Sequence, residues 1–185
     1  MKTRMLGRFL MAAALVAGAA SASTKGSANL PQSDSDIATN VRHAVTMYPY
    51  YSIWDDLSFR VADGNVSLTG EVNQPFKKQD IERLVQRVPG VASVTNDIKV
   101  LPLSSMDDRL RVQVARAIYR DPVLSGYAMG AVPAIHIIVE NGHVTLTGMV
   151  NSDMEKQIAG MRAASGLSFG PVTNNLVVEH PAKKS

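Results

Sequence analysis

The chain has 185 residues, with 19 lysines and arginines against 16 aspartates and glutamates, and it has no cysteine. The absence of cysteine excludes disulfides, thiolate metal sites and a cysteine nucleophile. It also excludes the lipid-modified cysteine that tethers some exported bacterial proteins to a membrane.

The first predicted element is an N-terminal secretory signal peptide. Lys2, Arg4 and Arg8 precede an apolar run over residues 9–20, and the small residues that end at Ala22 predict cleavage after it. The run has about twelve apolar residues, whereas a membrane-spanning helix needs roughly 20, which disfavours the alternative of an uncleaved anchor. We therefore expect an exported, soluble protein that is not a lipoprotein and that resides in the periplasm of a Gram-negative host.

Cleavage changes the charge of the chain. Three of the 19 basic residues and none of the 16 acidic residues lie in the predicted signal peptide, so the mature chain has 16 of each. Its formal net charge is therefore zero. A neutral, exported chain gives no reason to expect a nucleic-acid partner.

A repeated segment divides the mature chain into two modules. Residues 64–73 (GNVSLTGEVN) recur 78 positions later as residues 142–151 (GHVTLTGMVN). This period exceeds the roughly 20 to 50 residues of solenoid repeats, so it indicates two complete domains. The predicted organisation is a signal peptide at 1–22, a flexible lead-in at 23–33, module one at 34–101, a linker at 102–105, module two at 106–180 and a tail at 181–185.

Module one is predicted to contain a helix, a hairpin of two strands, a second helix and a last strand. The first helix begins with Asp34 or Ser35 as its cap, has one apolar face and ends before Pro49. The hairpin turns at residues 63–64, and the second helix ends at residues 89–90. This order predicts an α+β fold, with a three-stranded sheet that carries both helices on one face.

Module two repeats this αββαβ order with one departure. The apolar positions of its second helix, among them Met154, Ile158 and Met161, are displaced relative to module one. Gly160 should also weaken this helix by about 1 kcal/mol relative to alanine. We therefore expect a shorter or shifted second helix, followed by an irregular connection over residues 165–171.

Five glycines have predicted structural roles. Gly64 and Gly142 supply the positive φ of tight hairpin turns, and Gly90 follows the second helix of module one. Gly70 and Gly148 lie late in a strand and indicate a bulge or a close approach of the second helix. The hairpin glycines lie between strands, whereas phosphate-binding glycines precede a helix, so no phosphate loop is predicted.

These motifs resemble the BON domain, a module of the bacterial envelope. The resemblance is carried by the Val-x-Leu-Thr-Gly-x-Val strands at residues 66–72 and 144–150 and by Gly90, Val94 and Asn96 in the closing element. It covers nearly all of the mature chain. It implies an envelope protein linked to osmotic stress and described as chaperone-like, and related two-module lipoproteins bind anionic phospholipid.

No catalytic or metal-binding pattern is present in the sequence. The four histidines, at positions 43, 136, 143 and 180, are scattered and show no repeated pairing with carboxylates. We therefore expect no catalytic residue, no metal and no cofactor.

The first helix of module two contains a basic edge beside its apolar face. Arg109, Gln113, Arg116 and Arg120 follow the spacing of one helical face. Such an edge can rest on anionic headgroups, where each base contributes about 1 kcal/mol. The alternative is an ordinary solvated face whose charges are partly paired with acidic residues at positions 107, 108 and 121.

An aromatic segment separates the first helix of module one from its hairpin. Tyr50, Tyr51 and Trp54 lie in this loop, together with Tyr48 and Ile53. In an exposed loop these residues would contact a membrane interface or apolar segments of unfolded proteins. In a packed loop they would form the lid of the first core.

Three functions are therefore considered. The first is a non-enzymatic periplasmic protein of envelope maintenance or osmotic stress, which associates with phospholipid surfaces or binds exposed apolar segments like a chaperone. The second is a structural adaptor that binds a fixed envelope complex. The third, a small ligand-processing enzyme, has no visible reactive group to support it.

Overall fold

The computed structural model describes residues 32–130, 134–165 and 170–179, which belong to one compact unit. The predicted signal peptide, almost all of the lead-in, the tail and residues 166–169 of the predicted irregular connection lie outside the described residues. In the part of the chain that is described, no helix has both the length and the apolar character of a membrane span.

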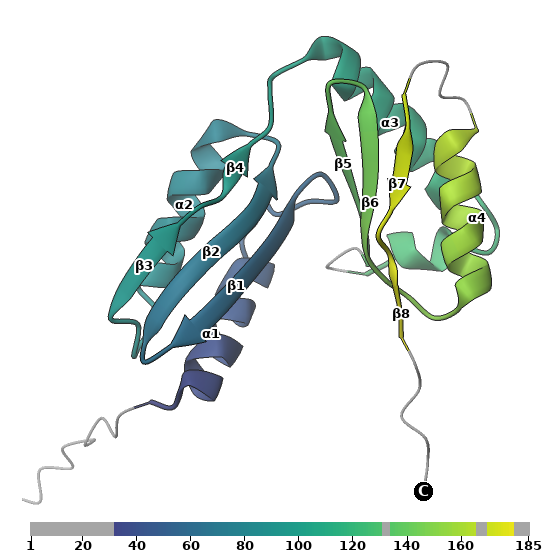
Figure 1. Ribbon diagram of the computed structural model, residues 1–185. Coiled ribbons are helices and arrows are strands. Elements are labelled where there is room, and N and C mark those ends of the chain that lie inside the picture. Colours follow the sequence, from purple (N-terminus) through teal and green to yellow (C-terminus); the bar gives the residue numbers. More distant parts are fainter. Residues whose placement is uncertain (1–31, 131–133, 166–169, 180–185) are drawn as a thin grey trace, which may run out of the picture. The chain divides into compact units, whose positions relative to one another are not determined.

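Module one has the predicted order of elements (Figure 1). They are α1 (Asp34–Thr46), β1 (Asp56–Ala62), β2 (Asn65–Val72), α2 (Pro75–Gln86), β3 (Ser93–Asn96) and β4 (Lys99–Val100). β1 pairs antiparallel with β2, while β3 and β4 pair parallel with the other side of β2. β1 is therefore one edge of this sheet, and β3 and β4 form the other.

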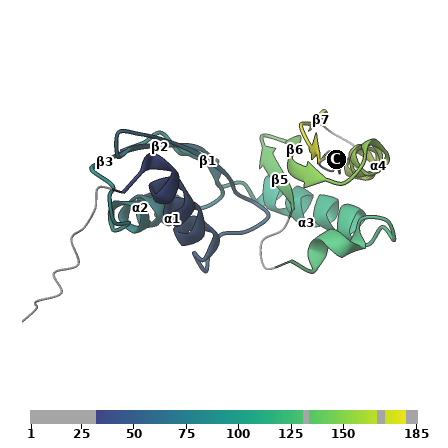
Figure 2. The same cartoon turned by 90° about the horizontal axis from the view of Figure 1, so that it is seen from below.

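Module two repeats the arrangement. Its elements are α3 (Ser105–Tyr119), the short 3₁₀ helix η1 (Ser125–Ala128), β5 (Ile135–Glu140), β6 (His143–Val150), α4 (Asp153–Ala164), β7 (Val172–Asn174) and β8 (Val177–Val178). Within each module, both α-helices cover the same face of the sheet (Figures 1 and 2). The predicted α+β fold with tandem αββαβ modules is confirmed.

The predicted last strand of each module is divided into two short strands. In module one the division follows Asn96, whose side-chain oxygen accepts a hydrogen bond from the Ile98 N–H at 3.2 Å and whose amide donates to the Lys78 carbonyl oxygen of α2 at 2.9 Å. Asn174 makes the equivalent bonds to Leu176 and Lys156. The repeated asparagine therefore ties the last strand to the second helix and interrupts the strand in the same place.

The first helix of module one is capped one residue earlier than its predicted candidates. Ser33 caps α1 and Ser104 caps α3, each through its side-chain oxygen. Asp34 accepts hydrogen bonds from the N–H groups of Asp63 and Gly64 at 2.8 and 2.9 Å instead. Asp107 does the same for residues 141 and 142. A carboxylate at the start of the first helix thus holds the hairpin turn in both modules.

Each module has its own apolar core. The buried core of module one consists of Ile37, Val41, Val45, Tyr48, Val66, Leu68, Val72, Ile81, Val85, Val88 and Ile98. The buried core of module two consists of Val114, Ile118, Leu124, Ile135, Ile137, Val139, Val144, Leu146, Val150, Ala159, Ala163 and Leu176. The repeated strand positions supply the centre of both cores, which explains their recurrence in the sequence.

The prediction of a shorter or shifted second helix in module two is wrong. α4 has 12 residues, as α2 has, and it occupies the same positions at the 78-residue offset. Its buried residues are Ala159 and Ala163, whereas Met154 and Met161 are exposed. Alanine and glycine let α4 approach the sheet closely, since a Cβ on Gly160 would lie 2.8 Å from the Asn174 side-chain nitrogen.

Gly70 and Gly148 accommodate a neighbouring strand, not the second helix. Their φ angles are +111° and +108°, a region that L side chains rarely adopt. A Cβ on Gly70 would lie 2.1 Å from the Asp56 carbonyl oxygen, and one on Gly148 would lie 2.0 Å from that of Ala134. Each glycine therefore lets the backbone at the start of the hairpin approach the second strand more closely than a residue with a Cβ would allow.

Candidate functional site

The exposed face of α3 contains the predicted basic edge. Arg109, Arg116 and Arg120 are exposed, and Gln113 lies among them on the same face. Their spacing of four, three and four residues keeps the four side chains within a narrow arc. The side chains of the three arginines make no ion pair or hydrogen bond with another described residue.

Apolar side chains flank these arginines. Met106 is 50% exposed and Val112 is 42% exposed, and both belong to the solvent side of α3. Their helical positions lie on either side of the row formed by the arginines. We call these residues, Met106, Arg109, Val112, Gln113, Arg116 and Arg120, the α3 face.

The acidic residues that were considered as partners for this face bind elsewhere. Asp107 holds the hairpin turn, as described above. Asp108 pairs with Arg111 at 2.5 Å, and Asp121 pairs with Arg162 at 2.6 Å. These three carboxylates form no ion pair with Arg109, Arg116 or Arg120, although Asp108 and Asp121 line the same surface hollows as these arginines.

Arg111 does not belong to the α3 face. Only 4% of its surface is exposed, and its guanidinium donates to the Val139 carbonyl oxygen of β5 at 2.7 Å. It thus lies over the edge strand of module two. This role could not be predicted from the sequence, because Arg111 stands next to the basic edge in the chain.

The aromatic segment of module one is mostly packed. Tyr48 is buried in the first core and donates to Asp80 at 2.8 Å, and Tyr51 is half-buried against the same core. Ile53 and Trp54 pack against the core of module two. Tyr50 is the exception, since 59% of its surface is exposed and its ring meets the ring of Phe76 edge to face.

A buried ion pair fixes the loop that carries Trp54. Asp55 is fully buried and lies 2.6 Å from the ammonium of Lys77, which is 4% exposed. The carboxylate also accepts hydrogen bonds from the N–H and hydroxyl of Ser52 and from the N–H of Asn73. The loop is therefore held to α2 by charge and by hydrogen bonds.

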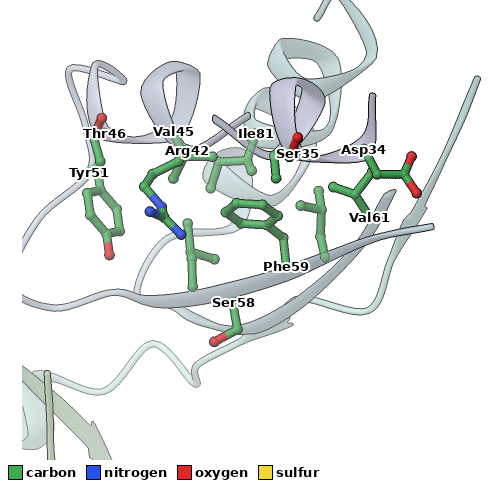
Figure 3. Close-up of a pocket in the computed structure, with 13 residues that line it drawn as sticks. Asp34, Ser35, Arg42, Val45, Thr46, Tyr51, Ser58, Phe59, Val61 and Ile81 are labelled. Atoms are coloured by element: carbon green, nitrogen blue, oxygen red, sulfur yellow. The ribbon is translucent and has the colours of Figure 1, made fainter. Parts of the chain in front are cut away.

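The structure contains a groove that the sequence did not reveal. It lies in module one between α1 and β1, and its volume is about 610 Å³. Figure 3 shows Arg42 reaching from α1 toward β1, with Phe59 and Val61 pointing from β1 into the groove. Ala38 and Thr46 contribute the small side chains of its helical wall. Arg42 makes no ion pair with another described residue.

The residue differences that leave this groove open can be found in the sequence when the first helices of the two modules are aligned at an offset other than 78 residues. The first helices align at 73 residues, since Asp34 and Asp107 have the same role. At that offset Ala38 corresponds to Arg111 and Thr46 to Tyr119. Comparison at the 78-residue offset alone hides these two differences.

No group suited to catalysis emerges among the described residues. Burial raises the pKa of Tyr119 to about 12, and burial together with the nearby Asp56 and Asp55 also raises the pKa of Tyr51. Both phenols are therefore neutral at physiological pH and serve in packing. Within residues 32–130, 134–165 and 170–179, no group of three or more histidine or acidic side chains is placed to hold a metal.

Comparison with known proteins connects this fold to one family. The family model described as the BON domain matches residues 33–102 and residues 107–180, so it covers both modules. No curated protein matches the chain.

Two matching solved structures come from Chlamydia trachomatis. One is described as CdsD, a structural protein of the type III secretion system, and the other as the C-terminal domain of CdsD. Their sequence identities are 14% and 17%, and each match covers 80% of this chain and 94% or 100% of the solved chain. Their TM-scores are 0.28 and 0.29, so the likeness supports no argument about this chain.

Proposed function

This chain belongs to the BON domain family of non-catalytic binding modules, and from that membership we propose that it is a non-enzymatic periplasmic protein that associates with anionic phospholipid surfaces through the α3 face. The association would serve maintenance of the envelope under osmotic stress. The observation that carries the proposal is the set of three exposed arginines, which form no ion pair with any described residue and are flanked by exposed apolar side chains.

The chemistry of the α3 face suits an interface between water and lipid. Arginine guanidinium groups pair with phosphate oxygens through several donors. Near an anionic surface each contributes about 1 kcal/mol, so three arginines contribute about 3 kcal/mol. The exposed side chains of Met106 and Val112 would enter the boundary between headgroups and acyl chains. The expected binding is therefore weak, reversible and sensitive to salt.

Sedimentation with vesicles tests this proposal. The protein from residue 23 onward is mixed with vesicles that contain phosphatidylglycerol and, separately, with vesicles of phosphatidylcholine alone. We expect binding to the anionic vesicles, a decrease with rising salt, and loss of binding in Arg116→Glu/Arg120→Glu. The matched control is Arg60→Glu/Arg87→Glu, which makes the same charge change at exposed positions of module one. Equal loss of binding in both double variants would mean that net charge, not the α3 face, determines the association.

We propose chaperone-like binding of exposed apolar segments as a second function, favoured by the groove of module one. The groove has a volume of about 610 Å³ and is lined in part by apolar side chains of β1. The measurement is light scattering of reduced insulin B chain with and without the protein. Suppression of scattering is expected to persist in Arg116→Glu/Arg120→Glu, because the α3 face lies in the other module.

A further inference from the structure

The outer edge of β5 in module two is covered by three hydrogen bonds. In the hairpin register, Ile135, Ile137 and Val139 direct their backbone groups away from β6. Tyr119 donates to the Ile135 carbonyl oxygen at 2.6 Å, and Arg111 donates to that of Val139 at 2.7 Å. Between them, the Ile137 N–H donates to the Ile53 carbonyl oxygen of the aromatic segment at 2.7 Å.

The covered edge of β5 is also fully buried. Ile135, Ile137 and Val139 each have no exposed surface. Ile53 and Trp54 contribute to this burial by packing against the core of module two. A short stretch of chain therefore lies along the edge strand, bonded through its backbone and packed through its side chains.

The same edge of module one is open. In the register of β1 with β2, Leu57, Phe59 and Val61 direct their backbone groups outward. Within the described part of the chain, these outward groups have no hydrogen-bond partner. The three side chains are only half-buried, and they form one wall of the groove.

Two residue differences between the first helices account for two of the three hydrogen bonds that cover β5; the third comes from the Ile53 segment, which has no counterpart at β1 among the described residues. Ala38 stands where module two has Arg111, and Thr46 stands where it has Tyr119. Neither small side chain reaches β1, so the groove of about 610 Å³ remains above the edge strand. An uncovered edge with apolar side chains is a template for strand addition.

We propose that β1 of module one binds an extended segment of another polypeptide as an added β-strand. The segment would pair with the backbone groups of Leu57, Phe59 and Val61, and its alternate apolar side chains would enter the groove below α1. Arg42 lines the groove, forms no ion pair with any residue that the structure describes, and would select an acidic side chain or a terminal carboxylate on the segment. This inference deepens the chaperone-like function proposed above and rests on it for the class of ligand.

Hydrogen exchange measured by NMR tests the inference. The probe is a seven-residue peptide of alternating serine and valine that ends in glutamate, added to the protein from residue 23 onward at up to about 1 mM. We expect exchange at the amides of Leu57, Phe59 and Val61 to slow by about tenfold or more. A peptide with the same side chains but N-methylated on alternate peptide bonds should give no protection, because it lacks the donors of a strand.

Variants that copy module two supply the matched control. Ala38→Arg/Thr46→Tyr should close the groove as Arg111 and Tyr119 close it in module two, and should abolish the protection. Thr39→Arg adds the same charge at an exposed position of α1 and should leave the protection unchanged. Circular dichroism confirms that each variant is folded.

Four results of the peptide experiments and the dimerisation assay would overturn the inference. The first two are that the peptide does not protect these amides from exchange and that the N-methylated peptide binds equally well. The third is that oleate, added in place of the peptide, protects the same amides. The fourth is that the wild-type chain dimerises and that Ala38→Arg/Thr46→Tyr abolishes the dimer. Insulin scattering separates the inference from the function on which it rests. If Ala38→Arg/Thr46→Tyr suppresses scattering as well as the wild type does, the chaperone-like function stands and strand addition at β1 is refuted.

Discussion

Removing Asp55 should destabilise module one more than removing its partner Lys77. Asp55→Ala leaves a buried ammonium without a counter-ion, and such a loss costs about 3 to 5 kcal/mol. Lys77→Met preserves the length of the side chain and leaves a carboxylate that still accepts three hydrogen bonds, two of them from backbone N–H groups. We expect the second variant to cost about 1 to 3 kcal/mol.

The double variant gives the sharper expectation. Asp55→Ala/Lys77→Met contains no unpaired buried charge, so it should be more stable than Asp55→Ala alone by about 1 to 2 kcal/mol. Urea unfolding followed by the fluorescence of Trp54, the one tryptophan of the chain, reports on this loop directly. With m values of about 1 to 3 kcal/mol per molar urea, the midpoint of Asp55→Ala should fall by roughly 1 M or more.

An exposed ion pair of the same length serves as the control. Arg83 and Asp80 also lie 2.6 Å apart, but 60% of the arginine side chain is exposed. Arg83→Met should change the free energy of unfolding by less than about 1 kcal/mol. If Lys77→Met costs as much as Asp55→Ala, or if the double variant is less stable than both single variants, the charge argument is refuted and packing of the two side chains holds the loop.

Three further changes have expected outcomes. Asp107→Ala should lower the free energy of unfolding by about 1 to 3 kcal/mol, because two N–H groups of the hairpin turn lose a charged acceptor, and thermal unfolding measures this. Gly160→Ala should destabilise the protein despite the helix propensity of alanine, because the new Cβ displaces the Asn174 amide; urea unfolding gives the sign. Burial holds the folded-state pKa of Tyr119 at about 12, above its ordinary value of about 10 in the unfolded chain, so stability should fall as the pH rises between these values. Tyr119→Phe should show a smaller decline over the same range when unfolding is followed by circular dichroism.

The fold was accessible from the sequence because its determinants are local or repeated. Alternation around residues 63–64 and 141–142 predicts the hairpins, and the helical stripes predict the first helices. The prediction for the second helix of module two is wrong because it assigns large apolar residues to the core. In the structure Ala159 and Ala163 face the core, and Met154 and Met161 face solvent. Small residues that permit close packing leave a weaker pattern than large ones.

The candidate surfaces could be predicted from the sequence only in part. The spacing of the arginines gives the α3 face, since helical geometry converts spacing into position. The groove of module one depends on Ala38 and Thr46, residues without chemistry of their own, whose significance appears only when their counterparts bond to a strand edge. The role of Trp54 likewise depends on contacts between residues far apart in the chain, such as Ile53 with Ile137.

The contacts of Ile53 and Trp54 make the completed core of module two dependent on residues of module one. The buried core of module one and the partly buried residues packed against it all precede residue 101, so this module can complete its core before the rest of the chain is available. The core of module two, by contrast, recruits Ile53 and Trp54 from the preceding module. Because synthesis begins at the N-terminus, Ile53 and Trp54 are already present when the strands of module two are made. If module two were synthesised first, the β5 edge would lack the contacts of Ile53 and Trp54 until module one was made.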